Sequence, residues 1–195
     1  SVGEALTPMV GESFRLRIEA QRVPSTASNV IGRRNQGAAR KIVVTAHIDA
    51  YEDSPGAVDN ASGTVVLLLL AEMISDYEGE YTLEIVAING EDHYSAGGEM
   101  DYLRRYGEEL SQVLLAVNID GVGYQRGGSA YSFYGCSPEV EGRARGALET
   151  LDGLLEGEAW FAGDHMVFVQ AGVPSVAFTA ELAGELTRTV THTSL

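Results

Sequence analysis

The chain has 195 residues, of which 45% are hydrophobic, and a formal net charge of −15 at pH 7. This length and composition predict one globular domain over residues 1–195. The negative charge argues against nucleic acid or an anionic membrane as a partner, because both carry negative phosphate groups. No stretch approaches the ~20 apolar residues of a membrane span, and residues 1–12 lack the pattern of a signal peptide. The oligomeric state stays open.

The predicted elements alternate between strands and helices along most of the chain. Residues 13–23 alternate apolar and charged side chains, which predicts a half-exposed strand, with residues 29–32 as its hairpin partner. Apolar runs predict further strands at 42–45, 81–88, 113–119, 130–134 and 173–178. Helices are expected at 61–77, 98–106, 138–151 and 163–171. This order indicates an α/β fold with a largely parallel sheet.

Acidic residues follow three consecutive predicted strands, at the point where each strand ends. Because the carboxyl ends of parallel strands meet at one edge of a sheet, we expect these residues to lie close together. A histidine accompanies them after the first strand, and a second histidine lies in the polar tail at 181–195. The residues concerned are His47, Asp49, Asp59, Glu91, Asp92, Asp120 and His192.

Two imidazoles and three carboxylates in this group have the chemistry of metal ligands: His47, Asp59, Asp92, Asp120 and His192. Taken singly, an aspartate in such a loop is more often a helix cap or turn residue than a ligand. Cys136 is the only cysteine, so any metal must be held by oxygen and nitrogen. Such donors suit zinc, manganese or cobalt, and a shared carboxylate is the usual bridge of a two-metal hydrolytic site. Glu91 is then the candidate general base.

Six short motifs occur in the order of a known family. They are HxD at 47–49, GAxDNASG at 56–63, NGED at 89–92, NID at 118–120, GDH at 163–165 and HT at 192–193. Together they resemble metallopeptidase family 28, the co-catalytic zinc aminopeptidases, over about 150 residues from Lys41 onward. The resemblance implies a zinc-exopeptidase-like fold, a three-layer αβα sandwich around a largely parallel mixed sheet.

The resemblance also implies a role for each residue of the site. Asp59 would bridge two zinc ions, with cobalt or manganese as other possible metals. His47 and Asp120 would complete one metal site, and Asp92 and His192 the other. Asp49 would accept a hydrogen bond from His47 and fix its tautomer. Glu91 would take a proton from the metal-activated water, so that the amino-terminal bond of a peptide with a free amino terminus is hydrolysed.

Three features depart from the commoner family pattern. Asp92 stands where a longer glutamate is usual, and Thr191 stands where a tyrosine often precedes the final histidine. The chain ends three residues after His192, so we expect a catalytic domain that is truncated at its C-terminal end. The family motif at 163–165 and nearby aromatic residues make Phe161, Asp164 and His165 candidates for the substrate pocket.

Two other functions remain open at this stage. The first is a related single-zinc acyltransferase of the glutaminyl cyclase type, and the second is a non-catalytic domain on the peptidase scaffold. The sequence does not decide which side chain the substrate carries. A secreted or periplasmic location is slightly favoured over a cytoplasmic one, from the habit of the family alone.

Overall fold

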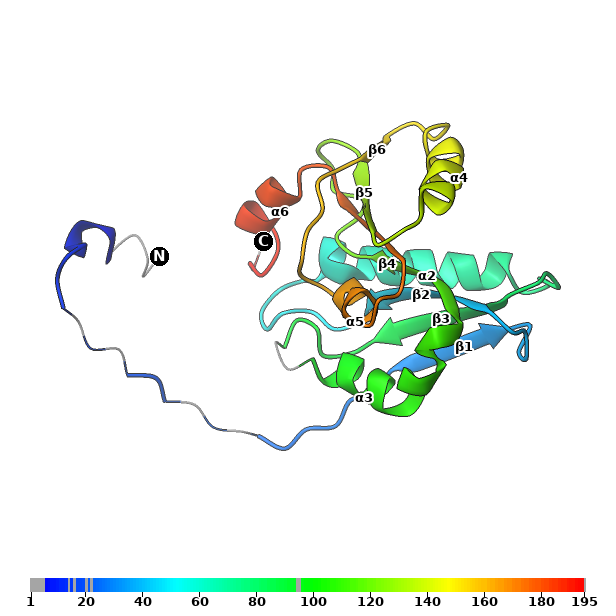
Figure 1. Cartoon of the computed structure of the whole chain (residues 1–195). Helices are drawn as coiled ribbons and strands as arrows, with labels where there is room; N and C mark the ends of the chain where they lie inside the picture. Colours follow the sequence, from blue (N-terminus) through cyan, green and yellow to red (C-terminus); the bar gives the residue numbers. More distant parts are fainter. Residues whose placement is uncertain are drawn as a thin grey trace.

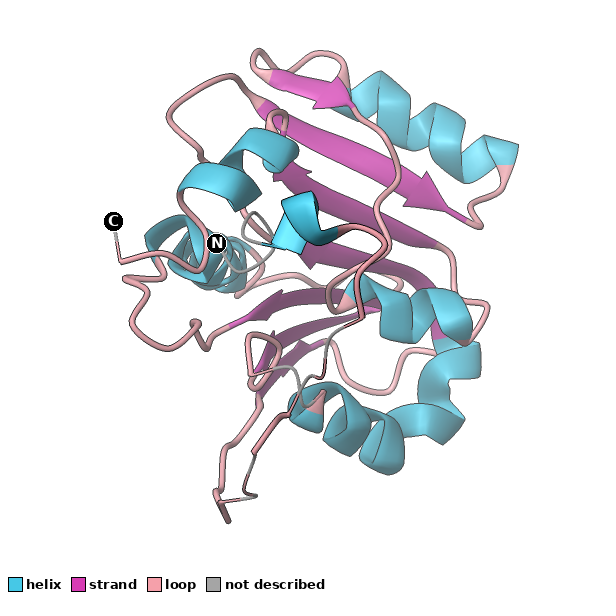
Figure 2. Cartoon of the chain, turned by 90° about the vertical axis from the view of Figure 1, so that its left-hand side faces the viewer, coloured by secondary structure: helices cyan, strands magenta, loops and turns pink. Residues whose placement is uncertain are grey.

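The computed structural model describes residues 6–13, 15, 17–19, 21, 23–93 and 96–194. Seven strands of this part of the chain form one mixed sheet with the order β1-β3-β2-β4-β7-β5-β6 (Figures 1 and 2). Their bounds are β1 Val30–Arg34, β2 Lys41–His47, β3 Thr82–Ile88, β4 Val113–Ile119, β5 Ser129–Tyr134, β6 Leu154–Glu156 and β7 Ser175–Ala180. The four central strands β3, β2, β4 and β7 are parallel. At one edge β1 is antiparallel to β3, and near the other β5 is antiparallel to β7.

Helices cover both faces of this sheet (Figure 1). The longer helices are α2 Ser62–Met73, α3 Gly97–Tyr106 and α4 Pro138–Leu148, and the shorter ones α5 His165–Gln170 and α6 Ala183–Thr189. Short 3-10 and π turns occupy Thr7–Met9, Ala57–Ala61 and Gly107–Gln112. Helix α2 lies on one face, and α3 and α5 lie on the other. The predicted three-layer α/β architecture is therefore confirmed.

Alternating side chains along the central strands supply a core to each face. On the α3 and α5 face, Val43 and Val86 pack in one buried cluster with Tyr102 and Phe168. On the α2 face, Ala46 packs with Leu67 and Ile119 in a second cluster, as expected for strands buried on both sides. The two clusters hold the strands rigidly, so the carboxyl ends of β2, β3 and β4 form a fixed platform.

The prediction of a hairpin between residues 13–23 and 29–32 is wrong in its pairing. Strand β1 pairs instead with β3, with Val30 opposite Ala87 and Arg34 opposite Leu83. None of the described residues between 13 and 23 belongs to a strand, whereas Phe14 and Leu16 lie outside the described residues. A period-two pattern shows that a segment can be a strand, but it does not select the partner.

Several other bounds differ from the sequence predictions. Helices α2 and α4 end at Met73 and Leu148, before the predicted 77 and 151. Strand β6 and helix α6 were not predicted at all, because β6 has three residues and α6 buries only Leu186. Helix α6 matters for the site, since it carries the chain back to the carboxyl edge of the sheet.

Helix α2 is apolar on its outer side as well as on its core side. Its large exposed side chains are Val65, Val66, Leu68, Leu69 and Met73. The helix has only twelve residues, and no described helix is long and apolar enough to cross a membrane.

Candidate metal centre

Two groups of potential ligands meet at the carboxyl edge of the sheet. The first consists of His47, Asp59 and Asp120, and the second of Asp59, Asp92 and His192; within each group the ligand atoms lie within 4.8 Å of one another. The structure therefore brings all five predicted ligands into two sites that share Asp59. Three of them come from the ends of adjacent parallel strands, as the spacing predicts.

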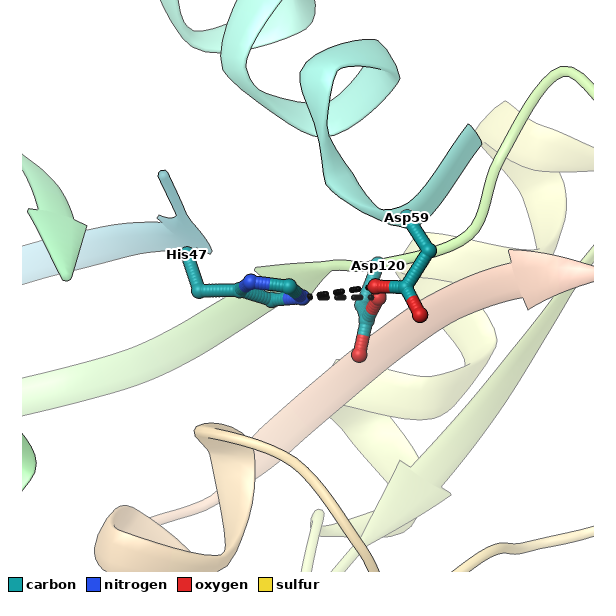
Figure 3. A group of neighbouring side chains, drawn as sticks. All are labelled: His47, Asp59 and Asp120. Atoms are coloured by element: carbon teal, nitrogen blue, oxygen red, sulfur yellow. Dashed lines mark ion pairs between the residues drawn. The ribbon is translucent and has the colours of Figure 1, made fainter. Parts of the chain in front are cut away.

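His47, the last residue of β2, points its Nε2 between two carboxylates of the first group (Figure 3). The distances are 3.1 Å to Asp59 Oδ1 and 3.4 Å to Asp120 Oδ1. The ring is only 1% exposed, and Nε2 has no hydrogen-bond partner among the described residues. A buried nitrogen without a partner that faces two carboxylate oxygens is an arrangement that a metal cation satisfies.

His192 plays the corresponding part in the second group. Its Nε2 lies 2.8 Å from Asp92 Oδ1 and 3.4 Å from Asp59 Oδ2. Asp59 thus turns one carboxylate oxygen toward each histidine. This geometry fits a carboxylate that bridges two metal ions, which is the role the family resemblance implies for it.

Asn60 fixes Asp59 beside Asp120. The Asn60 side chain is 1% exposed, and its Nδ2 donates to the Ile119 carbonyl at the end of β4, at 2.9 Å. Its Oδ1 accepts from the backbone N–H of Gly63 at 3.0 Å. A Cβ at Gly63 would lie 2.5 Å from both Asn60 Oδ1 and the Ile119 carbonyl, so only glycine allows the start of α2 to approach β4 so closely.

Asp49 holds the loop that carries Glu91 and Asp92. Its Oδ1 accepts from the backbone N–H groups of Gly90 at 2.8 Å and Glu91 at 3.2 Å, and its Oδ2 from that of Asp92 at 3.0 Å. The predicted contact with His47 is less direct. His47 Nδ1 lies 3.1 Å from the Asp49 backbone carbonyl and 3.7 Å from its carboxylate. The carbonyl is thus the nearer acceptor for the imidazole, and the carboxylate mainly organises the loop.

The crowding of carboxylates gives the site a negative potential. Burial lowers the pKa of His47, but its contacts with Asp120, Asp49 and Asp59 outweigh burial and raise that pKa well above its usual value. Burial raises the pKa of Glu91 to about 7, and the charges of Asp120, Asp92 and Asp59 add to this effect. Burial and the Asp59 charge likewise raise the pKa of Asp92. A bound cation would offset this repulsion, so the residues present fit a divalent metal.

A cleft of about 340 Å³ opens over these ligands. Its acidic wall is formed by Asp59, Glu91, Asp92 and Asp120. The opposite wall carries small and apolar residues from the 160–163 loop and from α6, namely Trp160, Ala162, Gly163, Ala183, Gly184 and Leu186. The cleft could therefore hold a positively charged amine at one side and an apolar group at the other.

None of the three residues predicted for the substrate pocket is among the residues that line this cleft. Phe161 is 73% exposed and points its ring toward Tyr134, whereas Asp164 and His165 are each 1% exposed. His165 Nε2 lies 3.0 Å from the Trp160 carbonyl, and the two rings are 4.4 Å apart. His165 therefore supports Trp160, which lines the cleft, from behind.

Sequence reasoning missed two residues of the site: Tyr51, and Asn60 as a link to β4. Asn60 follows the proposed bridging ligand directly, and a polar side chain before a helix signals a cap rather than a contact with a distant strand. Tyr51 contacts His192, which is far away in the chain. No local pattern predicts that contact.

Comparison with known proteins decides the family. The sequence profile of peptidase family M28 matches residues 29–195. The chain belongs to peptidase family M28. Aminopeptidase YwaD of Bacillus subtilis (strain 168) is 27% identical over 187 residues, which cover 90% of this chain and 40% of that protein.

Solved structures of similar proteins agree with the M28 assignment. A zinc aminopeptidase from Bacillus subtilis superposes with a TM-score of 0.70 and 28% identity, over 85% of this chain and 43% of that one. A glutaminyl cyclase from Bacteroides thetaiotaomicron superposes with a TM-score of 0.61 and 18% identity, over 76% of this chain and 62% of that one. The two proteins share the fold. This M28 chain thus spans about two fifths of the length of the aminopeptidases it matches.

Proposed function

We propose that this chain carries the catalytic centre of a zinc-dependent aminopeptidase with two metal ions. His47, Asp59 and Asp120 would hold one ion, and Asp59, Asp92 and His192 the other. The observation that carries the proposal is the position of Asp59, whose two carboxylate oxygens face a different histidine each. Membership of peptidase family M28 and the similarity to zinc aminopeptidases support it.

The protein's own residues would divide the work of hydrolysis. When bound, the two ions supply electrophilic activation of the peptide carbonyl and of water. Glu91 lines the cleft beside the ligands and would accept the proton of the attacking water, then pass it to the leaving amine. Burial and the neighbouring carboxylates raise the pKa of Glu91 to about 7 in the metal-free protein, so this side chain holds a proton more readily than an ordinary glutamate.

Asp49 would act through the loop and not on the substrate. Its three backbone hydrogen bonds hold residues 90–92. Burial raises the pKa of Asp49, but the His47 imidazole and the hydrogen bond from the Gly90 N–H outweigh burial and lower that pKa to about 2. An ionised Asp49 therefore keeps Glu91 and Asp92 in place over the working pH range.

The chemistry of the cleft indicates a peptide with a free amino terminus as the substrate. The net charge of −15 would attract the positively charged α-ammonium group of such a substrate at longer range. The wall formed by Trp160 and α6 has no charged residue among its lining side chains, which favours an apolar first side chain.

The substitution Glu91→Gln tests this proposal. We expect hydrolysis of leucine p-nitroanilide to fall by about 10²- to 10⁴-fold, the usual contribution of a general base, while zinc content measured by elemental analysis stays at two per chain. Glu108→Gln, on an exposed residue of the turn before β4, is the matched control and should retain full activity. Unchanged turnover in Glu91→Gln would exclude Glu91 as the base.

The same measurements separate the alternatives. One zinc per chain together with cyclisation of amino-terminal glutamine would indicate an acyltransferase of the glutaminyl cyclase type. Protein that binds no zinc in calorimetric titration would leave only a non-catalytic scaffold.

A further inference from the structure

Tyr51 touches two of the three residues in the second candidate metal site. It lies in the loop between β2 and the turn at Ala57–Ala61. Its backbone N–H donates to Asp92 Oδ2 at 2.8 Å. Its ring stacks on the His192 imidazole, with the ring centroids 4.8 Å apart and the planes 23° apart. One residue thus contacts Asp92 through its backbone and His192 through its side chain.

The two histidines of the centre are held in different ways. His47 belongs to a central strand and is buried on every side, so the sheet fixes its imidazole. His192 lies in the turn after α6, in a left-handed conformation with φ 57°, and its side chain is 33% exposed. Its position therefore depends more on side-chain contacts, and the stack with the Tyr51 ring is one of them.

We infer that Tyr51 is a positioning residue that holds the His192 imidazole ready for the second metal and thereby sets the affinity of that site. The inference rests on the two-metal proposal above. An aromatic stack restrains the plane of the imidazole while leaving Nε2 directed at Asp92 and Asp59. Groups that orient a ligand from behind commonly change metal affinity by about 10- to 100-fold.

Substitution of the Tyr51 side chain tests the stack on His192 separately from the contact with Asp92. The hydrogen bond to Asp92 uses the Tyr51 backbone N–H, which every variant keeps. We would titrate zinc into metal-stripped wild-type, Tyr51→Phe and Tyr51→Ala proteins by calorimetry. Tyr51→Ala should weaken one of the two sites by about tenfold and leave the other unchanged. Tyr51→Phe, which keeps the stacking surface, should bind like the wild type.

A second measurement uses the unmodified protein and does not depend on how the variants fold. Nuclear Overhauser contacts between the Tyr51 and His192 rings should be present in the metal-free wild type. The absence of these contacts would overturn the inference. It would also be overturned if each site of Tyr51→Ala bound zinc as tightly as the same site of the wild type.

Activity assays on the same proteins separate this inference from the proposed function. Selective weakening of one zinc site in Tyr51→Ala, without peptide hydrolysis by any of the proteins, would support the role of Tyr51 and refute the aminopeptidase. Hydrolysis by the wild type with unchanged zinc binding in Tyr51→Ala would do the reverse. A wild type that binds no zinc would overturn both.

Discussion

Asp164 is a buried carboxylic acid close to the candidate metal centre. It is 1% exposed, and neither of its oxygens has a hydrogen-bond partner among the described residues. Glu99, in the first turn of α3, is also buried and has an Oε2 without a partner. Burial raises the pKa of Asp164 well above its usual range, and the charge of Glu99 raises it further. The fold therefore favours the protonated acid.

The sign of this effect gives a stability prediction for Asp164→Asn. A folded state that holds a proton more tightly than the unfolded chain loses stability as the pH rises above the unfolded pKa, about 3.9 for aspartate. The amide of asparagine cannot ionise, so the variant does not meet the repulsion between Asp164 and Glu99. We expect the variant to raise the free energy of unfolding of the metal-free protein by about 1 kcal/mol at pH 8 and by less at pH 5. Urea denaturation at both pH values checks this, and equal loss of stability at both would contradict it.

Residue type and spacing were enough to predict that five potential ligands lie close together, because each of them follows a strand end or belongs to a family motif. They were not enough to separate Asp164 and His165 from the cleft. Both residues belong to the GDH motif at 163–165, which resembles a motif of the family. Only the packing at the start of α5 shows that both side chains are buried. Burial is a property of the assembled layers, so local sequence could not reveal it.

Asn60 shows how the elements create the centre. It joins the start of α2 to the end of β4 through Ile119 and Gly63, and so keeps Asp59 opposite Asp120. The Asn60→Ala substitution would remove the buried side-chain partners of the Ile119 carbonyl and the Gly63 N–H. We expect it to lower the free energy of unfolding by about 2 to 4 kcal/mol and to weaken zinc binding.

Chemical denaturation in the presence of a chelator measures the stability part of this prediction without any contribution from metal. Ser62→Ala provides the control, since the Ser62 hydroxyl donates only to the nearby Val58 carbonyl and should matter by less than about 1 kcal/mol. If Asn60→Ala and Ser62→Ala had the same small effect, the link between α2 and β4 would not be what holds Asp59.

At the level of elements, the central strands were predictable and the edges were not. Strand β4 occupies the predicted residues 113–119, and β2 and β3 lie within two residues of their predicted bounds, because long apolar runs are the strongest local signal. Strand β6 and helix α6 have few buried residues, so their sequences carry little of that signal. The pairing of β1 with β3 depends on contacts between distant segments.

The candidate metal centre and the apolar outer side of α2 lie on different parts of the molecule. The carboxylates of the candidate centre gather at the carboxyl edge of the sheet. The apolar residues Leu68, Leu69 and Met73 face outward on α2, adjacent to a cavity of about 400 Å³ between α2 and strands β1 and β3. The centre therefore derives its order from the sheet and its loops, and not from the outer side of α2.

Because the five candidate ligands come from five separate segments, metal binding should stabilise the molecule as a whole. A ligand that binds only the folded state adds about 2.7 kcal/mol at one hundred times its Kd. For a chain of this size each kcal/mol raises the unfolding temperature by about 2 to 4 °C, so zinc should raise it by roughly 5 to 11 °C over chelated protein. Differential scanning calorimetry measures this shift.

The Glu91→Gln variant makes this thermal test specific. Glu91 belongs to neither group of candidate ligands, so the variant should show the same zinc-dependent rise as the wild type even though its activity is lost. Asp59→Ala removes the shared carboxylate and should abolish most of the rise. A rise that survives in Asp59→Ala would mean that zinc stabilises the chain from another place, and the two-site centre around Asp59 would have to be abandoned.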